Sequence, residues 1–374
     1  FEDKLEKALS GRFGIEASSI SLLSLINLAG AGIMALLGAP LDGYMLLFLA
    51  ISIAHPLMAA HQLRRAEIRK GSREIDDELL ARVKPHLAWT MVSTLVAAFS
   101  NKAIETYLLN RLVGAEAVGF FTIAATLARG GVDLLSSGLM TVLMPVLANA
   151  YGAGGQQRIH RLGGDAVRYF HFLGLLLTGV GYFWARPVVE LTYGSSYAPA
   201  IFALQMMVLV RGVTLSYAAF GALLTITDNQ RLRAAEAVFA VVTSAGMALW
   251  LVPTHGLEGA IYAHMASTLA VFLFTFGCVW WVLRMPLPLG ELMRMSAAAL
   301  SAAALCFGAL SLSEAPTLLH QLLAGLLYVV SYLLSTLIFR VWNQNDIVLL
   351  DQLGQRVPAL RRLALLLVPW ARPA

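Results

Sequence analysis

Five ionisable side chains lie deep inside long apolar segments of the chain. They are Lys102, Glu105, Arg129, Asp133 and Arg211. If these segments are membrane helices, Arg129 lies about 15 Å from Gly119 and Arg211 about 21 Å from Tyr197, at 1.5 Å per residue. A charge at the centre of a bilayer costs about 2.5 to 3.5 kcal/mol, so such a group usually faces a partner or a watery cavity. These residues are therefore candidates for binding a charged ligand.

The cations in this set are suited to an anion such as phosphate. Arginine offers a planar fork of donors and lysine a point charge, and phosphate oxygens accept charge-assisted hydrogen bonds from both. Asn101, next to Lys102, adds an amide donor. We therefore predict an anion site formed by Lys102, Arg129, Arg211 and Asn101.

An alternative interpretation is that these charges merely neutralise one another. Arg129 and Asp133 are four residues apart, and Lys102 and Glu105 are three apart, which are the spacings of ion pairs on one helix. Arg211 has no acidic residue within four positions. Both interpretations stay open, because an anionic ligand can displace a carboxylate.

The remaining candidate ligands give no metal or cofactor pattern. His171 and His264 are embedded in apolar runs without the spacing of a metal motif, and we predict core histidines bonded to neighbouring helices. Cys278 and Cys306 also lie in apolar runs, as small core residues rather than a disulfide or metal site. The sequence therefore predicts no metal and no cofactor.

Membrane helices must position these side chains. Hydrophobic residues make up 58% of the 374 residues and charged residues 13%, whereas soluble domains are nearer half apolar and a quarter charged. Lipid leaves only helices or closed barrels, and the runs are too long and uniform for barrel strands. We predict an all-α polytopic membrane protein with about ten spans of about 20 residues. The predicted spans are 18–37, 40–60, 86–110, 117–150, 166–184, 197–227, 232–252, 257–283, 293–312 and 317–340.

Lysine and arginine collect in alternate connections between these spans. By the positive-inside rule this places both ends of the chain in the cytoplasm. The net charge of +5 is spread over short segments and forms no basic domain. Nucleic acid is therefore excluded as a partner.

The longest connection, residues 62–85, is dense in both charge signs and predicts an exposed cytoplasmic helix that links two helical bundles. The tail, residues 343–374, alternates apolar and charged positions. This pattern is typical of a helix lying in the membrane interface.

Several segments, in their order and spacing, resemble a known family. They are residues 101–105, 112–121, 144–151, 187–197, 228–231 and 252–260. The chain resembles the polysaccharide-transporter branch of the MOP exporter superfamily, the Wzx-type flippases of lipid-linked O-antigen and exopolysaccharide units. The resemblance extends over residues 85–281 and is otherwise one of topology.

The resemblance implies two six-helix bundles followed by two further helices. The implied organisation is the end of the first bundle at 1–61, the linker at 62–85, the second bundle at 86–283, the accessory pair at 284–342 and the tail at 343–374. The first bundle would then be incomplete, with its other helices before Phe1.

The resemblance also implies a transporter rather than an enzyme. The expected substrate is an undecaprenyl-diphosphate-linked oligosaccharide, flipped across the bacterial inner membrane by alternating access through a cationic central cavity. Family transporters are often driven by a proton or sodium gradient, and the candidate coupling carboxylates here are Asp133, Glu105 and Glu236. The implied partners are membrane lipids, a polysaccharide polymerase and a chain-length regulator.

Three other functions stay open. A MATE-like drug or cation antiporter would need acidic rather than basic cavity groups. A membrane glycosyltransferase or polymerase would carry its catalytic groups on a sizeable outer loop, and the predicted outer loops are short. A scaffold without transport activity fits an incomplete first bundle.

Overall fold

The structure is a computed structural model that describes residues 22–65, 77–100, 103–312, 317–344 and 346. Two compact units divide the chain, residues 1–80 and residues 81–374.

The first unit contains two helices joined by a tight turn, Leu22–Leu36 and α2, Leu41–Arg65. Gly38 takes a φ of 62° in the turn, a conformation that glycine adopts without steric cost. The Leu47 side chain lies against Gly30, so the two helices pack where a side chain is missing. Leu36 is 89% exposed, as expected for a surface that lipid covers.

Helices make up most of the described residues of the second unit. In chain order its elements are α3 (Asp77–Ser100, of which the part from Ala81 belongs to this unit), α4 (Ala103–Leu112), α5 (Ala115–Tyr193), a short 3₁₀ turn (Ser195–Tyr197), α6 (Pro199–Val213), α7 (Tyr217–Ile226), α8 (Gln230–Trp281), α9 (Leu289–Ser311) and α10 (Leu318–Ile338).

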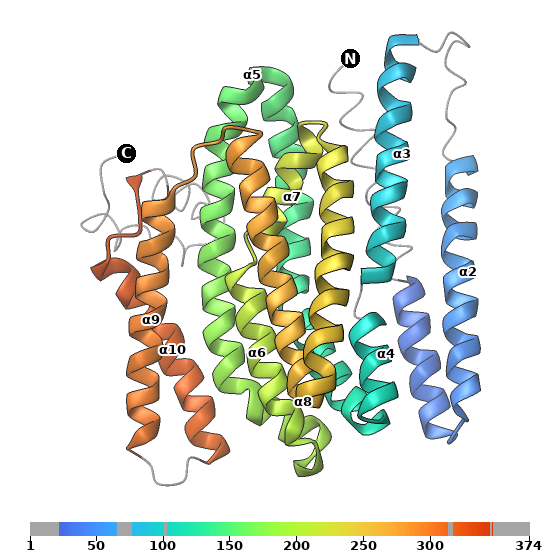
Figure 1. Cartoon of the computed structure of the whole chain (residues 1–374), viewed down its shortest axis with the longest axis vertical. Coiled ribbons are helices and arrows are strands. Elements are labelled where there is room, and N and C mark those ends of the chain that lie inside the picture. Colours follow the sequence, from blue (N-terminus) through green and yellow to red (C-terminus); the bar gives the residue numbers. More distant parts are fainter. Residues whose placement is uncertain (1–21, 66–76, 101–102, 313–316, 345, 347–374) are drawn as a thin grey trace. The chain divides into compact units, whose positions relative to one another are not determined.

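Helices α5 and α8 each fold back on themselves. A straight helix of the 79 residues of α5 would be about 118 Å long at 1.5 Å per residue, well beyond the roughly 30 Å of a bilayer core. Gly155 (φ 60°, ψ −150°) interrupts α5 and Gly256 (φ 56°, ψ −125°) interrupts α8. Each helix therefore forms two antiparallel arms (Figure 1). In α5 we call residues 115–154 the first arm and residues 156–193 the second arm.

The reversal of α5 falls within residues 151–165, the predicted connection between two spans, and these residues are helical apart from the break at Gly155. Gln156, Gln157 and Arg158 are good helix formers and begin the second arm directly after the break. Only glycine readily takes the backbone angles of the reversal.

Four described helices are long and apolar enough to cross a membrane, and the bent α6–α7 pair makes a fifth. The all-α polytopic membrane fold is therefore confirmed, whereas the number of about ten spans stays a prediction.

The predicted linker is split between the end of α2 and the start of α3. Its residues 66–76 lie outside the described residues, as does most of the predicted tail. The domain boundaries stay predictions.

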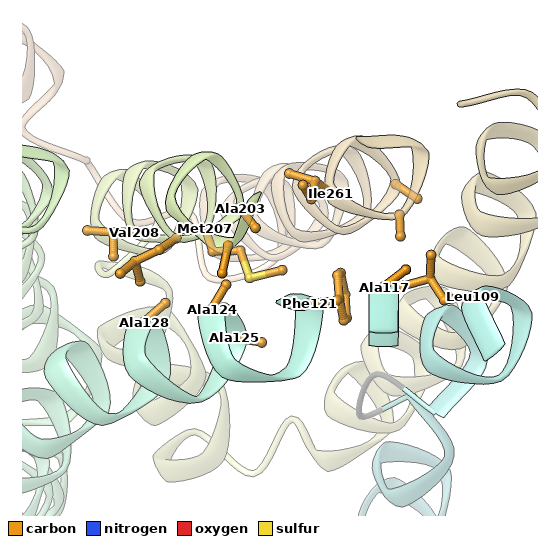
Figure 2. Packing of buried hydrophobic residues seen from close by; sticks show 14 of the residues in the cluster. Leu109, Ala117, Phe121, Ala124, Ala125, Ala128, Ala203, Met207, Val208 and Ile261 are labelled. Carbon is orange, nitrogen blue, oxygen red and sulfur yellow. The ribbon is translucent and has the colours of Figure 1, made fainter. Parts of the chain in front are cut away.

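Small residues bring the helices of the second unit close together. Ala124, Ala125 and Ala128 of the first arm are buried against α6 and α8, where Met207 and Ile261 lie (Figure 2). Alanine at such interfaces lets two backbones approach. The packing therefore holds α6 firmly against α5.

Helix α10 is fastened to the second arm by aromatic donors to backbone carbonyl oxygens. Tyr328 donates to Leu175 at 3.0 Å, Tyr332 donates to Phe172 at 3.2 Å, and the indole of Trp184 donates to Leu322 at 3.1 Å. A hydrogen bond of this kind contributes about 0.5 to 1.5 kcal/mol. The α9–α10 pair is thus part of the second unit's core.

A buried ionic cluster completes this attachment. Arg168, on the second arm, is 3% exposed and pairs with Asp346 at 2.8 Å, with Asp165 at 3.3 Å, and with Glu291 of α9. The Tyr169 hydroxyl donates to the other oxygen of Asp346 at 2.7 Å. We call these five residues the Arg168 cluster.

Candidate functional site

A cavity of about 460 Å³ lies among α4, the first arm of α5, α6, α7 and α8. We call it the central cavity. Its lining is Glu105, Val132, Asp133, Ser136, Arg211, Thr214, Leu215, Tyr217, Ala218, Ala240, Ser244, His264, Ser267, Thr268, Val271 and Phe272. This volume is within the range of about 300 to 1,000 Å³ typical of small-molecule sites.

A break in one span shapes the cavity wall. Helix α6 ends at Val213 and α7 begins at Tyr217, with a bend of 43° between them. The Thr214 hydroxyl donates back to the carbonyl of Val210 at 2.8 Å, a type of bond that competes with helix geometry and favours a bend. Thr214, Tyr217 and neighbouring residues consequently face the cavity.

Arg211 lies in the last turn of α6, just before this break. A cation is favourable there because the carbonyl groups at a helix C-terminus carry partial negative charge. The next residue, Gly212, lies so close to Gly174 of the second arm that a Cβ on either glycine would collide with the carbonyl oxygen of the other. This contact fixes α6, and Arg211 with it, at the cavity.

Asp133 is shared by two arginines. Its Oδ1 accepts a hydrogen bond from Nη1 of Arg211 at 3.2 Å, and its Oδ2 lies 4.0 Å from Nε of Arg129, one turn earlier in α5. The three side chains are 26% (Arg211), 46% (Asp133) and 38% (Arg129) exposed. Ion pairs this accessible to water contribute only about 0.2 to 1 kcal/mol, so a stronger anion can replace the carboxylate. We call these residues the Asp133 cluster.

Glu105 forms a second polar centre in the same cavity. It lies in the first turn of α4 and is 2% exposed, and its Oε1 accepts a hydrogen bond from the Ser244 hydroxyl at 2.8 Å. His264 of α8 also lines the cavity, with its ring edge-on to Phe121. This part of the cavity is suited to a cation or a proton rather than an anion.

The structure brings together most of the predicted site residues that it describes. Arg211, Asp133 and Glu105 line the central cavity, and Arg129 reaches it through Asp133. Lys102 and Asn101 lie outside the described residues.

Glu236 does not line the cavity. Its carboxylate pairs with Arg233 at 2.7 Å and also binds the hydroxyl of Tyr217, a lining residue. Glu236 is therefore connected to the cavity only through that hydroxyl.

Arg211 has no acidic residue within four positions of the sequence, yet it pairs with Asp133, which lies 78 positions away. A pair between two helices cannot be recognised from spacing along one helix. The described lining carries Arg211 together with the two predicted carboxylates, Asp133 and Glu105. A cationic cavity stays a prediction.

Sequence reasoning missed the hydroxyl groups of the lining, among them Ser136, Ser244, Ser267 and Thr268. A signal was available on α8, where His264, Ser267 and Thr268 are spaced by three and four residues within an apolar span. That spacing places them on one helix face. His264, predicted as a core histidine, belongs to this polar face.

His171 is bonded to a neighbouring helix, as the sequence predicts. His171 is buried, with Nε2 3.0 Å from the Ser296 hydroxyl of α9. Cys278 and Cys306 are free thiols. Within the described ranges there is no group of three side chains that could hold a metal ion.

Sequence comparison gives one family. A family model described as "Polysaccharide biosynthesis protein" matches residues 15–202, half of the chain. Comparison with curated proteins gives no match.

Structural comparison gives a transporter fold. The chain is similar to "Lipid II flippase MurJ, inward closed conformation", with a TM-score of 0.62 and 13% sequence identity, over 88% of this chain and 67% of that chain. At this identity the similarity concerns the fold alone. It agrees with the MOP exporter resemblance seen in the sequence.

Proposed function

Because this chain belongs to the polysaccharide biosynthesis protein family, we propose that it carries the head group of a lipid-linked oligosaccharide across a membrane. The similarity in fold to a protein described as a lipid II flippase supports transport rather than an enzymatic reaction. The specific substrate that we propose is an undecaprenyl-diphosphate-linked polysaccharide repeat unit.

The Asp133 cluster is the observation that carries this proposal. A diphosphate has several oxygens that accept charge-assisted hydrogen bonds. In the Asp133 cluster, the guanidinium groups of Arg129 and Arg211 flank the Asp133 carboxylate, which a ligand can displace, at a cavity open to water. When diphosphate enters, its oxygens replace the Asp133 carboxylate at Arg211 and Arg129. When it leaves, Asp133 pairs with them again, so an empty cavity does not hold two uncompensated cations.

The other lining groups suit the sugars. Ser136, Thr214, Ser267 and Thr268 present hydroxyl groups that can donate to and accept from sugar hydroxyls. Lys102 and Asn101 immediately precede α4, whose first turn carries Glu105. We propose that they extend the anion site from this end of the cavity.

We further propose that Glu105 couples transport to a proton or sodium gradient. A buried carboxylate beside a serine hydroxyl and near a cavity histidine can gain and lose one positive charge during a cycle. Asp133 is the second candidate because the substrate displaces it. Glu236 is the weakest of the three, since Arg233 already neutralises it.

The cellular setting is part of the proposal. We propose a bacterial inner-membrane location, both ends of this chain in the cytoplasm, and a two-bundle architecture in which residues 86–283 form the second bundle and residues 284–342 the accessory pair. A polysaccharide polymerase and a chain-length regulator are the proposed protein partners.

A transport assay tests the proposal directly. Purified protein in liposomes should move a fluorescent undecaprenyl-diphosphate-linked oligosaccharide from one leaflet to the other. In cells, deletion of the gene should leave such lipids on the inner leaflet. Normal lipid-linked pools together with normal surface polysaccharide would refute the assignment.

One observation favours a second candidate, an antiporter for organic cations. Two carboxylates, Asp133 and Glu105, line the central cavity, and Glu105 is nearly fully buried. Such groups would attract a cationic drug. Uptake of ethidium by the same liposomes along a proton gradient, without movement of the lipid-linked sugar, would support this candidate instead.

A further inference from the structure

A second cavity lies between the two arms of α5 and α6. Its volume is about 360 Å³. Among its lining residues are Leu127 and Gly131 of the first arm, Val180 and Trp184 of the second arm, and Val208 of α6. The indole nitrogen of Trp184 is already bonded to α10, so it brings no free donor to this lining. We call this cavity the apolar chamber.

The apolar chamber adjoins the central cavity. Val132 lines both, and the next residue, Asp133, holds the two arginines. On α6, Val208 lines the chamber and Arg211, one turn later, lines the central cavity. The same two helices therefore present hydrocarbon to one cavity and charge to the other.

The chamber is suited to a hydrocarbon chain. Apolar cavities of about 150 Å³ stay dry and hold a molecule as large as benzene, and this one is more than twice that volume. Gly131 is exposed, and a Cβ built on it meets no atom within 4 Å, so the wall is open at this point. A linear chain with small branches can enter such a space, whereas a sugar would lose its hydrogen bonds to water there.

We propose that the apolar chamber binds the isoprenoid chain next to the diphosphate of the lipid-linked substrate, while the diphosphate lies at the Asp133 cluster. This inference rests on the proposed function. Binding the first isoprene units beside the arginines positions the diphosphate and leaves the rest of the chain in the bilayer. The substrate is then recognised by the junction of charge and hydrocarbon, whichever sugar it carries.

Photocrosslinking tests the proposal. The probe is farnesyl diphosphate with a diazirine on its second isoprene unit, added to the purified protein in phosphatidylcholine liposomes. Labelled peptides should come from the segments that line the chamber, residues 127–132, 177–188 and 204–208, and undecaprenyl phosphate should compete with the label. Labelling confined to residues outside these segments, or displaced equally well by phosphatidylglycerol, would overturn the proposal and indicate an ordinary lipid contact.

Glycine substitutions provide matched variants. G131L puts a side chain into the open space of the chamber, whereas G130L adds the same side chain at a neighbouring exposed position that is not in its lining. G131L should reduce labelling about tenfold, the effect of excluding two buried methylene groups. G130L should label like the unmodified protein. Equal labelling of the two variants would contradict the proposal. If G131L does not fold, the positions labelled in the unmodified protein decide whether the chamber binds the probe.

Transport measurements separate this inference from the proposed function. If G131L keeps full transport and labelling while R211Q loses transport, the chamber proposal fails and the flippase proposal stands. If the unmodified protein labels in the segments that line the chamber but moves no lipid-linked sugar, the chamber proposal stands and the flippase proposal fails.

Discussion

Two arginine clusters in the second unit use the same chemistry in opposite ways. In the Arg168 cluster one arginine serves three carboxylates, and both Arg168 and Asp346 are almost completely buried. In the Asp133 cluster two arginines share one carboxylate, and Arg211 and Asp133 line a cavity. The first arrangement leaves the guanidinium of Arg168 no donor for a ligand, whereas in the second Arg211 keeps donors for one.

The difference shows what separates an arginine that stabilises the fold from one that binds a ligand. It is the burial of the guanidinium and the number of carboxylates paired with it, rather than the presence of arginine in a membrane helix. A buried pair contributes little net stability, yet removing one partner costs much, because the other is left uncompensated. A water-accessible pair costs little to break. The two clusters should therefore respond differently to substitution.

The largest expected effect is on Arg168. R168M should lower the free energy of unfolding by about 3 to 5 kcal/mol, because Asp346 would remain buried without its cation. Thermal unfolding in detergent measures this. R158M, which removes an exposed arginine of the same helix, is the control. A stable R168M protein would show that the cluster does not hold α9 and α10.

The next effect is on transport through Arg211. R211Q should reduce transport about 10- to 100-fold, since a hydrogen bond to a charged group contributes about 1.5 to 3 kcal/mol, while thermal stability changes little. R186Q is the matched control, because Arg186 pairs with Glu190 on its own helix at 2.5 Å and does not line the central cavity. Full transport by R211Q at normal expression would remove Arg211 from the site.

A smaller effect of opposite sign is expected at Asp133. D133N removes the anion that competes for the two arginines, so inorganic diphosphate should bind up to about fivefold more tightly, matching a water-accessible pair of at most 1 kcal/mol. Isothermal titration calorimetry measures the change. Weaker diphosphate binding by D133N would show that Asp133 orients the arginines rather than competing for them.

The smallest effect is that of salt. Raising the ionic strength shortens the distance over which water-accessible charges interact, whereas buried pairs are screened much less. Diphosphate affinity should therefore fall with added sodium chloride, while the unfolding temperature of the unmodified protein should change little. If salt lowers the diphosphate affinity and the unfolding temperature together, the Arg168 side chain is more open to water than its 3% exposure indicates.

The sequence predicted the membrane fold, because that follows from the length of apolar runs. The depth of Arg129 and Arg211 in the membrane stays a prediction. The sequence could not predict that Arg211 pairs with Asp133, since that contact depends on how α6 packs against α5. Arg168 lies at the edge of a predicted span, where an arginine is unremarkable, and its main partner is 178 positions away. The reversals at Gly155 and Gly256 fall within the predicted connections 151–165 and 253–256. The length of apolar runs could not show that the residues around each glycine are helical.

Asp346 has a consequence for the order in which the chain is completed. It follows α10, the last described membrane helix, and Asn343 and Asp346 each bind the other's backbone N–H at 2.9 Å, which sets the carboxylate in place. During synthesis, Arg168 enters the membrane long before this partner is made. The guanidinium therefore gains its ion pair with Asp346 only after the ribosome has passed α10, and a nascent chain that stalls earlier would carry an incompletely neutralised charge.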